Sequence, residues 1–375
     1  LPREKESIFE HVEPCTESVK ISILLNELEA EFRQHISCDA EAAIAATLWI
    51  ASTWVIDVTD FAPIACVVAP EKRCGKSTAL DFFELTVKNP IKADNASAAA
   101  IFRVIEKYRP TILLDEIDTY LASNSELIGI FNGGNKPNGG TVRCDGKEHE
   151  PKIFKTFSAK AVAGIGTVPS TIGDRGIEIK LTRKLVGENL KRLDSRSKTW
   201  DYLKSRLARF EIQFCEMADD YKKMAGEMPL EFNSRQADNA LILYAIAKSG
   251  SDEWFSKCDK ALKVIYGREQ GDSVGVELLT DIARILFNNG RIKFSLADLT
   301  AWLTTDDELR WQTHLMGRVI TVRWLSAKLR TFDIKPATVN LGEKVNPKGY
   351  CEHQFNDAFD RYISRRSLAD ITKGE

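Results

Sequence analysis

The stretch that decides the fold is APEKRCGKST, residues 69–78, which directly follows the apolar run PIACVVA at residues 63–69. The run is typical of a strand buried on both faces, and a helical pattern extends from the loop to about Val87. A loop of this composition between a buried strand and a helix is typical of phosphate binding, because backbone N–H groups at a helix N-terminus surround an anion. The sequence therefore predicts a nucleotide phosphate site here.

Individual positions of this loop have expected roles in holding ATP and Mg²⁺. Lys76 is expected to reach the β- and γ-phosphates, and the Ser77 hydroxyl to ligate Mg²⁺. Pro70 stands where the pattern GxxxxGK[ST] has glycine, but it lies at the loop entrance, before the N–H groups that wrap the phosphate. The residues expected to bind ATP are Pro70, Glu71, Lys72, Arg73, Cys74, Gly75, Lys76, Ser77 and Thr78.

A second strand-like run, TILLDEID at residues 111–118, ends in carboxylates. Asp115 is expected to hold the Mg²⁺ shell, and Glu116 to orient the attacking water as a general base. Asp118 is expected to cap a helix rather than to bind the metal. An apolar run ending in two carboxylates is weak evidence by itself, but after a phosphate-binding loop it predicts ATP hydrolysis.

Residues 159–184, AKAVAGIGTVPSTIGDRGIEIKLTRK, resemble AAA+ ATPases. In those proteins a sensor-1 strand ends in a small polar residue, and a loop then leads to an Asp/Ser-Arg pair before the next strand. The resemblance implies that Thr167 contacts the γ-phosphate or the water. It also implies that Arg175 is an arginine finger acting on a neighbouring subunit, with Arg183 as a competing finger. The alternative for Arg175 is a salt bridge with Asp174 or another acidic side chain.

The segment SRQADNALILYAIAK, residues 234–248, looks like the sensor-2 helix of some AAA+ helicases. In those helicases an arginine at the start of the helix touches the γ-phosphate in cis. The resemblance implies this role for Arg235, and the alternative is a solvated helix start.

Strands that alternate with helices predict an α/β fold with a three-layer, mostly parallel sheet and a P-loop, AAA+-like core. The four expected strands are PIACVVA, TILLDE, AKAVAGIG and GIEIKL. Three helices followed by a hairpin near the C-terminus are the order of a winged helix. We expect a linker at 1–16, N-terminal helices at 17–60, the ATPase core at 61–185, a helical lid at 186–268 and a winged-helix domain at 269–375.

Two basic segments are candidates for DNA binding. Residues 131–157 are rich in glycine and predict an inserted hairpin, and hairpins at this place line the central pore of ring-shaped helicases. Residues 317–349, in the expected winged helix, could place a helix in the major groove and a wing on the backbone. The alternatives are a solvated loop and a packing module. The candidate DNA contacts are Lys136, Arg143, Lys147, Arg323, Lys328 and Lys348.

Charge and cysteine spacing exclude several classes of function. The 375 residues carry a net charge of −2, so any basic surface must be local. The eight cysteines never form a CxxC pair, which argues against a zinc site and fits free thiols in a reducing cytoplasm. The longest apolar run, residues 42–56, is shorter than the roughly 18 residues that a membrane span needs. We therefore expect a cytoplasmic protein with no membrane partner.

The run from about Val19 to Ile363 resembles the helicase-like ATPase family catalogued as domain of unknown function 3631. The motifs that carry this resemblance are APEKRCGKS, ASAAAIFRVIEKYRPTILLDEID, IFNGGNK, FKTFSAKAVAGIG, PSTIGDRGIEIKLTRK and LSAKLRTFDIKP…KGY. That family follows primase-type modules in phage, plasmid and mobile-element replication proteins. With Leu at position 1, the resemblance implies a fragment of a longer chain with a primase module upstream.

These patterns together predict an ATP-dependent DNA helicase or translocase with ATP and Mg²⁺ as cofactors. Hydrolysis is expected between subunits of a homo-oligomeric ring, a hexamer, with single-stranded DNA in the pore and duplex DNA at the winged helix. The alternative is a nucleotide-switched DNA-binding or assembly factor, in replication initiation or phage defence, that does not unwind. Strong stimulation of ATPase activity by single strands would favour the helicase.

Overall fold

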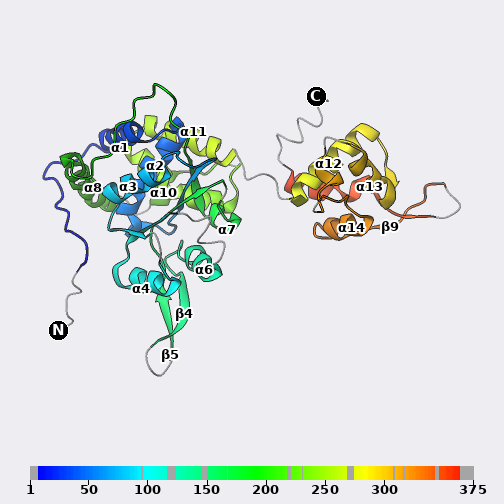
Figure 1. Ribbon diagram of the computed structural model, residues 1–375, viewed down its shortest axis with the longest axis horizontal. Coiled ribbons are helices and arrows are strands. Elements are labelled where there is room, and N and C mark those ends of the chain that lie inside the picture. Colours follow the sequence, from blue (N-terminus) through cyan, green and yellow to red (C-terminus); the bar gives the residue numbers. More distant parts are fainter. Residues whose placement is uncertain are drawn as a thin grey trace. The chain divides into compact units, whose positions relative to one another are not determined.

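The computed structural model divides the chain into two compact units, Leu1–Arg268 and Glu269–Glu375 (Figure 1). The structure describes residues 7–93, 96–115, 124–145, 150–166, 168–217, 221–229, 231–267, 274–306, 309–315, 317–342 and 346–363. Within them, no helix is both long enough and apolar enough to cross a bilayer.

A five-stranded parallel sheet forms the centre of the first unit, in the strand order β2-β3-β6-β1-β7. Its strands are β1 (Ile64–Ala69), β2 (Pro90–Ala93), β3 (Thr111–Leu114), β6 (Lys160–Ile165) and β7 (Gly176–Lys180). The four predicted strands are confirmed. Strand β2 was not predicted, because its sequence PIKA is half-buried along its length and has no continuous apolar run. Because all neighbours pair in parallel, the carboxyl ends of the strands share one edge of the sheet.

Helices cover both faces of this sheet, which confirms the predicted three layers. Along β1, Ala65 and Val67 contribute to the core on one face, and Ile64 and Cys66 to the core on the other. The first face carries α1 (Ile21–His35), α2 (Ala40–Trp54), α3 (Lys76–Thr86), α8 (Lys198–Met217), α9 (Tyr221–Ala225), α10 (Ser234–Gly250) and α11 (Asp252–Gly267). The second face carries α4 (Ala98–Tyr108), α6 (Ser125–Gly133) and α7 (Ser170–Gly173).

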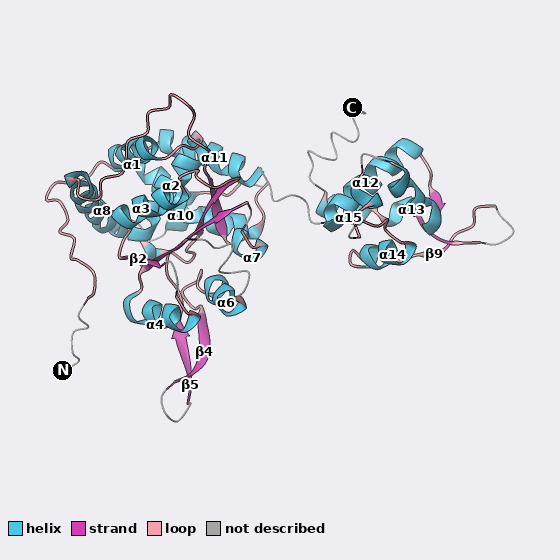
Figure 2. Cartoon of the chain, viewed as in Figure 1, coloured by secondary structure: helices cyan, strands magenta, loops and turns pink. Residues whose placement is uncertain are grey.

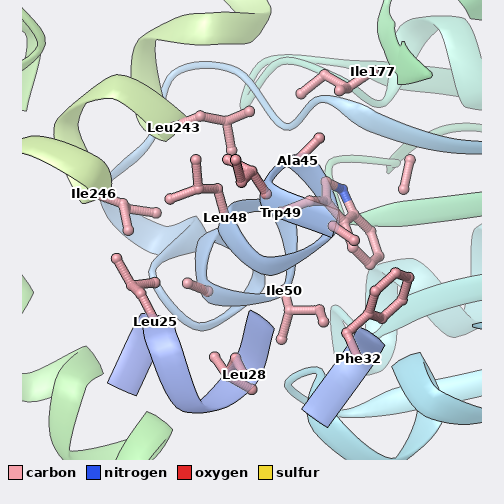
Figure 3. Close-up of a cluster of buried hydrophobic side chains, with 14 of the residues drawn as sticks. Leu25, Leu28, Phe32, Ala45, Leu48, Trp49, Ile50, Ile177, Leu243 and Ile246 are labelled. Atoms are coloured by element: carbon pink, nitrogen blue, oxygen red, sulfur yellow. The ribbon is translucent and has the colours of Figure 1, made fainter. Parts of the chain in front are cut away.

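Helix α2 is buried almost throughout and lies at the centre of the first core. Asp39 caps it by accepting a hydrogen bond from the Ala42 N–H, and side chains of α2 lie among those of α1 and α10 (Figure 3). The N-terminal helices and the helices that follow the sheet therefore share one core. Helical structure after the sheet begins at Lys198, later than the expected start near residue 186. Residues 186–197 are irregular, and their backbone bonds instead to the end of α1, as in the Lys191 N–H donating to the Gln34 carbonyl.

A β-hairpin extends from the second face of the sheet, as predicted for residues 131–157 (Figure 2). It consists of β4 (Gly140–Asp145) and β5 (Glu150–Lys155), which pair antiparallel. Phe154 of β5 packs against Phe102 of α4 with ring centroids 4.6 Å apart, and this contact anchors the hairpin to α4.

The second unit has its own core and a three-stranded antiparallel sheet in the order β8-β10-β9. Its elements are α12 (Val274–Asn289), β8 (Lys293–Ser295), α13 (Leu296–Thr305), α14 (Val322–Arg330), β9 (Ala337–Thr338), β10 (Lys348–Cys351) and α15 (Asn356–Tyr362). In its core the Trp311 indole N–H donates to the Asp281 carboxylate at 2.8 Å. Three helices and a hairpin thus occur in the predicted order.

Candidate functional site: a phosphate-binding loop and an arginine cluster

The loop between β1 and α3 lies at the carboxyl edge of the sheet. Its backbone is left-handed at Arg73 and at Gly75, with φ of +65° and +84°, and α3 begins directly after Gly75. The first turn of α3 contains no acidic residue. Its unpaired N–H groups and the helix dipole therefore favour an anion at this place.

The two side chains expected to hold Mg²⁺ are in direct contact across this edge. The Ser77 hydroxyl donates a hydrogen bond of 2.8 Å to the Asp115 carboxylate, which follows β3. Hydroxyl and carboxylate oxygens are ligands that Mg²⁺ prefers, with phosphate oxygens and water completing its coordination. No cluster of three or more His, Cys, Asp or Glu residues that could hold a metal occurs among the described residues.

Only some of the other residues predicted at this edge are among those that the structure describes. Glu116, Asp118 and Thr167 lie outside the described residues. The residue before Thr167, Gly166, donates its N–H to the Ala69 carbonyl at 2.9 Å, so the end of β6 meets the start of the phosphate-binding loop. Arg183 is exposed and follows the end of β7, on the same edge as the loop.

Arg175 lies at the opposite, amino edge of the sheet. The Ile64 N–H, at the first residue of β1, donates to the Arg175 carbonyl at 3.0 Å. The loop follows Ala69, the last residue of the same strand, and at about 3.3 Å per residue the two edges are roughly 17 Å apart. Arg175 therefore lies at the end of the sheet away from its own phosphate-binding loop.

Arg235 lies at this amino edge too, whereas the contact expected in cis was with a γ-phosphate at the carboxyl edge. Its guanidinium donates to the Asp174 carboxylate at 2.5 Å, and the Asn239 amide donates to the Asp174 carbonyl at 3.1 Å. The start of α10 is thereby packed against the residues before β7, away from the phosphate-binding loop. The alternative salt bridge between Arg175 and Asp174 is not formed, because Asp174 pairs with Arg235.

The three basic residues predicted to bind DNA in the segment 131–157 differ in what their side chains contact. Arg143 forms an ion pair with Glu126 at 2.7 Å and lies over the ring of Phe102, so a phosphate contact by Arg143 would have to replace this ion pair. Lys136 is exposed, with its ammonium 4.8 Å from the centre of the Phe61 ring. Lys147 lies outside the described residues.

The basic residues of the second unit lie on two elements. Arg323 is exposed on α14, and Lys328 is half-buried on the same helix. The Lys348 ammonium donates to the Thr338 hydroxyl at 3.1 Å, between the strands of the β9–β10 pair. Arg323 is therefore the candidate with the least constrained side chain in this unit.

Lys160 was not predicted as a site residue, and it is fully buried at the start of β6. Its ammonium donates to three backbone carbonyls at the root of the hairpin: Gly134 at 2.8 Å, Thr156 at 3.2 Å and Ser158 at 2.8 Å. Burial lowers the pKa of Lys160 to about 7. The signal in the sequence was a lysine at the first position of an apolar strand. A lysine buried there needs hydrogen-bond partners for its ammonium, and this indicates a structural role.

Comparisons with known proteins found distant structural similarities and one family model that matches part of the chain. The C-terminal region of NrS-1, in an A-form apo structure, is 14% identical, with a TM-score of 0.41 over 91% of this chain and 77% of that chain. The ADP form of the Aeropyrum pernix ORC2 protein is 10% identical, with a TM-score of 0.27 over 87% and 93%. No curated protein matches. Residues 180–362, just under half of the chain, match the model of the family described as protein of unknown function DUF3631.

Proposed function

We propose that the protein is an AAA+-like ATPase that hydrolyses Mg-ATP between subunits of a ring and moves DNA through the ring. The observation that carries this proposal is the Ser77–Asp115 hydrogen bond beside the phosphate-binding loop. It joins the two side chains that would hold Mg²⁺, at the carboxyl edge of a parallel sheet where nucleotides bind. Lys76, at the first position of α3, would contact the β- and γ-phosphates.

The position of Arg175 supports hydrolysis between subunits. It lies at the edge of the sheet opposite its own loop, so a contact with a γ-phosphate requires the loop of another copy. An interface that joins one edge to the opposite edge of a neighbour is head-to-tail, and such interfaces form rings when the rotation between subunits closes. A hexamer is the ring that the sequence resemblance suggests. Arg183, on the same edge as the loop, would then act within its own subunit.

DNA contacts in this proposal come from both units. The β4–β5 hairpin extends from the sheet, and Lys136 and Lys147 would contact the backbone of a single strand in the pore. In the second unit, the element order and the strand order β8-β10-β9 support a winged helix with Arg323 of α14 in the major groove. A role in replication, with a primase module upstream, completes the proposal.

An assembly factor that does not unwind DNA is the second candidate, and one feature favours it. Val142 and Ile153 are paired across the hairpin and are 60% and 69% exposed. Adjacent exposed apolar side chains are more typical of protein contacts than of phosphate contacts. In this case ATP would control assembly, and hydrolysis would be slow.

Unwinding of a forked duplex, with mass measurement of the assembled species, tests the proposal. A helicase unwinds the fork with ATP and shows ATPase activity stimulated by single strands. A switch binds DNA in an ATP-dependent way without turnover.

Subunit mixing tests the ring. Arg175→Ala protein should bind ATP and fail to hydrolyse it, because an arginine finger is worth about 10³ to 10⁵ in turnover. Mixed with Lys76→Ala protein, it should regain partial activity, since one interface then pairs an intact Lys76 with an intact Arg175. No rescue at any ratio, or activity that does not depend on protein concentration, would contradict hydrolysis between subunits.

A further inference from the structure

Three charged side chains meet at the amino edge of the sheet: Asp174, Arg175 and Arg235, which we call the arginine cluster. Asp174 and Arg175 precede β7, whereas Arg235 belongs to the first turn of α10. The ion pair between Arg235 and Asp174 spans 61 residues of sequence, and its side chains are 56% and 37% exposed. The cluster therefore carries a net positive charge at the surface.

Within the cluster, Arg175 is the arginine without a carboxylate partner. Its guanidinium donates to the Thr171 carbonyl at 2.8 Å and makes no ion pair in the described part of the chain. Burial lowers the pKa of Arg175, and the positive charge of Arg235 lowers it further. The Asp174 carboxylate, one residue away in the sequence, raises the pKa of Arg175 through its charge, but its hydrogen-bonded ion pair is with Arg235.

Arg235 is fixed in the position that holds Asp174. Asn233 caps α10 by accepting hydrogen bonds from the Arg235 and Gln236 N–H groups, both at 3.0 Å, and the Gln236 side chain accepts from the Asn233 N–H. This capping box sets the first turn of the helix. On the other side, the Asn239 amide holds the Asp174 backbone. Both partners of the ion pair are therefore positioned before any neighbour arrives.

We propose that Arg235 is a positioning residue that binds the Asp174 carboxylate and so leaves the Arg175 guanidinium available to the γ-phosphate of a neighbouring subunit. This inference rests on the proposed function of Arg175. Without Arg235, Asp174 pairs with Arg175, because a carboxylate beside two cations binds the one that remains. Arg175 would then have to break an ion pair each time it engages a phosphate.

Variants that remove the charge of Arg235, of Asp174 or of both test this inference. Arg235→Ala should lower kcat for ATP by at least about tenfold, a small part of what a finger supplies, with KM for ATP unchanged. Asp174→Asn should keep nearly full activity, because the competing charge is gone. The double variant Arg235→Ala with Asp174→Asn should regain activity close to that of Asp174→Asn alone. If the double variant stays as slow as Arg235→Ala, Arg235 acts by itself and the inference is wrong.

A matched control removes another ion pair from the same helix. Lys248 pairs with Asp252 at 2.5 Å near the end of α10. Lys248→Ala should leave kcat unchanged, and all variants should have melting temperatures near that of the wild type. A loss of kcat in Lys248→Ala would point to the stability of α10 and overturn the inference.

The mixing experiment separates this inference from the proposed function. If Arg175→Ala is not rescued by Lys76→Ala, catalysis between subunits fails and the role of Arg235 falls with it. If that rescue occurs but Asp174→Asn does not restore Arg235→Ala, only the positioning role is wrong.

Discussion

The Ser77 hydroxyl and the Asp115 carboxylate are joined by a 2.8 Å hydrogen bond that links the first turn of α3 to the end of β3. The two strands that lead to these residues, β1 and β3, are not neighbours, because β6 lies between them in the sheet. The contact is therefore made above the edge of the sheet, where the phosphate-binding loop lies. The two side chains that we propose as Mg²⁺ ligands therefore lie together in the structure.

Ser77→Ala should weaken the response to Mg²⁺ more than the binding of nucleotide. The hydroxyl ligand is lost, while Lys76 and the loop N–H groups remain. We expect the Mg²⁺ concentration for half-maximal ATPase activity to rise about tenfold, on the scale of one lost metal-site partner. ATP binding measured by calorimetry in EDTA should be unchanged. Weaker binding in EDTA would mean that Ser77 shapes the loop itself.

Glu116→Gln should bind ATP and hydrolyse it about 10² to 10⁴ times more slowly, because only the residue that orients water is altered. Single-turnover hydrolysis and nucleotide binding measure the two effects separately. Asp118→Asn is the matched control, since Asp118 is expected to cap a helix and its loss should leave turnover near the wild-type rate. Equal losses in the two variants would show that the assignment of the general base is wrong.

Replacing Lys136 and Lys147 with alanine should weaken binding of single-stranded DNA and flatten its dependence on salt. Each lost phosphate contact should reduce the slope of log K against log salt by about 0.7. Binding at several salt concentrations measures this slope. Lys198 and Lys260, exposed on α8 and α11, provide a control pair of equal charge. If both pairs change the slope equally, the hairpin is not a DNA site.

Arg323→Ala should weaken binding of duplex DNA with little effect on basal ATPase activity. A lost phosphate contact in duplex DNA changes the salt slope by about 0.9. Arg361, exposed on α15 and paired with Asp357, is the matched control. Unchanged duplex affinity in Arg323→Ala would favour a packing role for the second unit.

Lys160 should make stability depend on pH above neutrality. The unfolded chain keeps the Lys160 proton up to the ordinary pKa, whereas burial makes the folded chain release it near pH 7. Above pH 7 the unfolded state thus binds more protons, and the contribution of Lys160 to stability rises with pH. Between pH 7 and 8.5 the free energy of unfolding should rise by about 2 kcal/mol more in the wild type than in Lys160→Met. An equal rise in both proteins would mean that the three carbonyls keep Lys160 protonated.

The sequence by itself determined the features that depend on neighbours along the chain. The loop between β1 and α3 and four of the strands could be predicted because a buried strand is a short apolar run and the loop follows it directly. The hairpin was visible because glycines surround two short β-prone segments. The strand β2 was missed, since a half-buried edge strand does not need an apolar run.

Only the tertiary structure decided which charged side chains are paired and at which edge of the sheet they lie. Arg235 was assigned to its own phosphate site, but α10 packs at the amino edge and brings it to Asp174, 61 residues earlier. Arg143 was assigned to DNA, but the hairpin brings it to Glu126 of α6. The partner of a charge is set by packing between distant segments, because charges attract through space and not along the sequence.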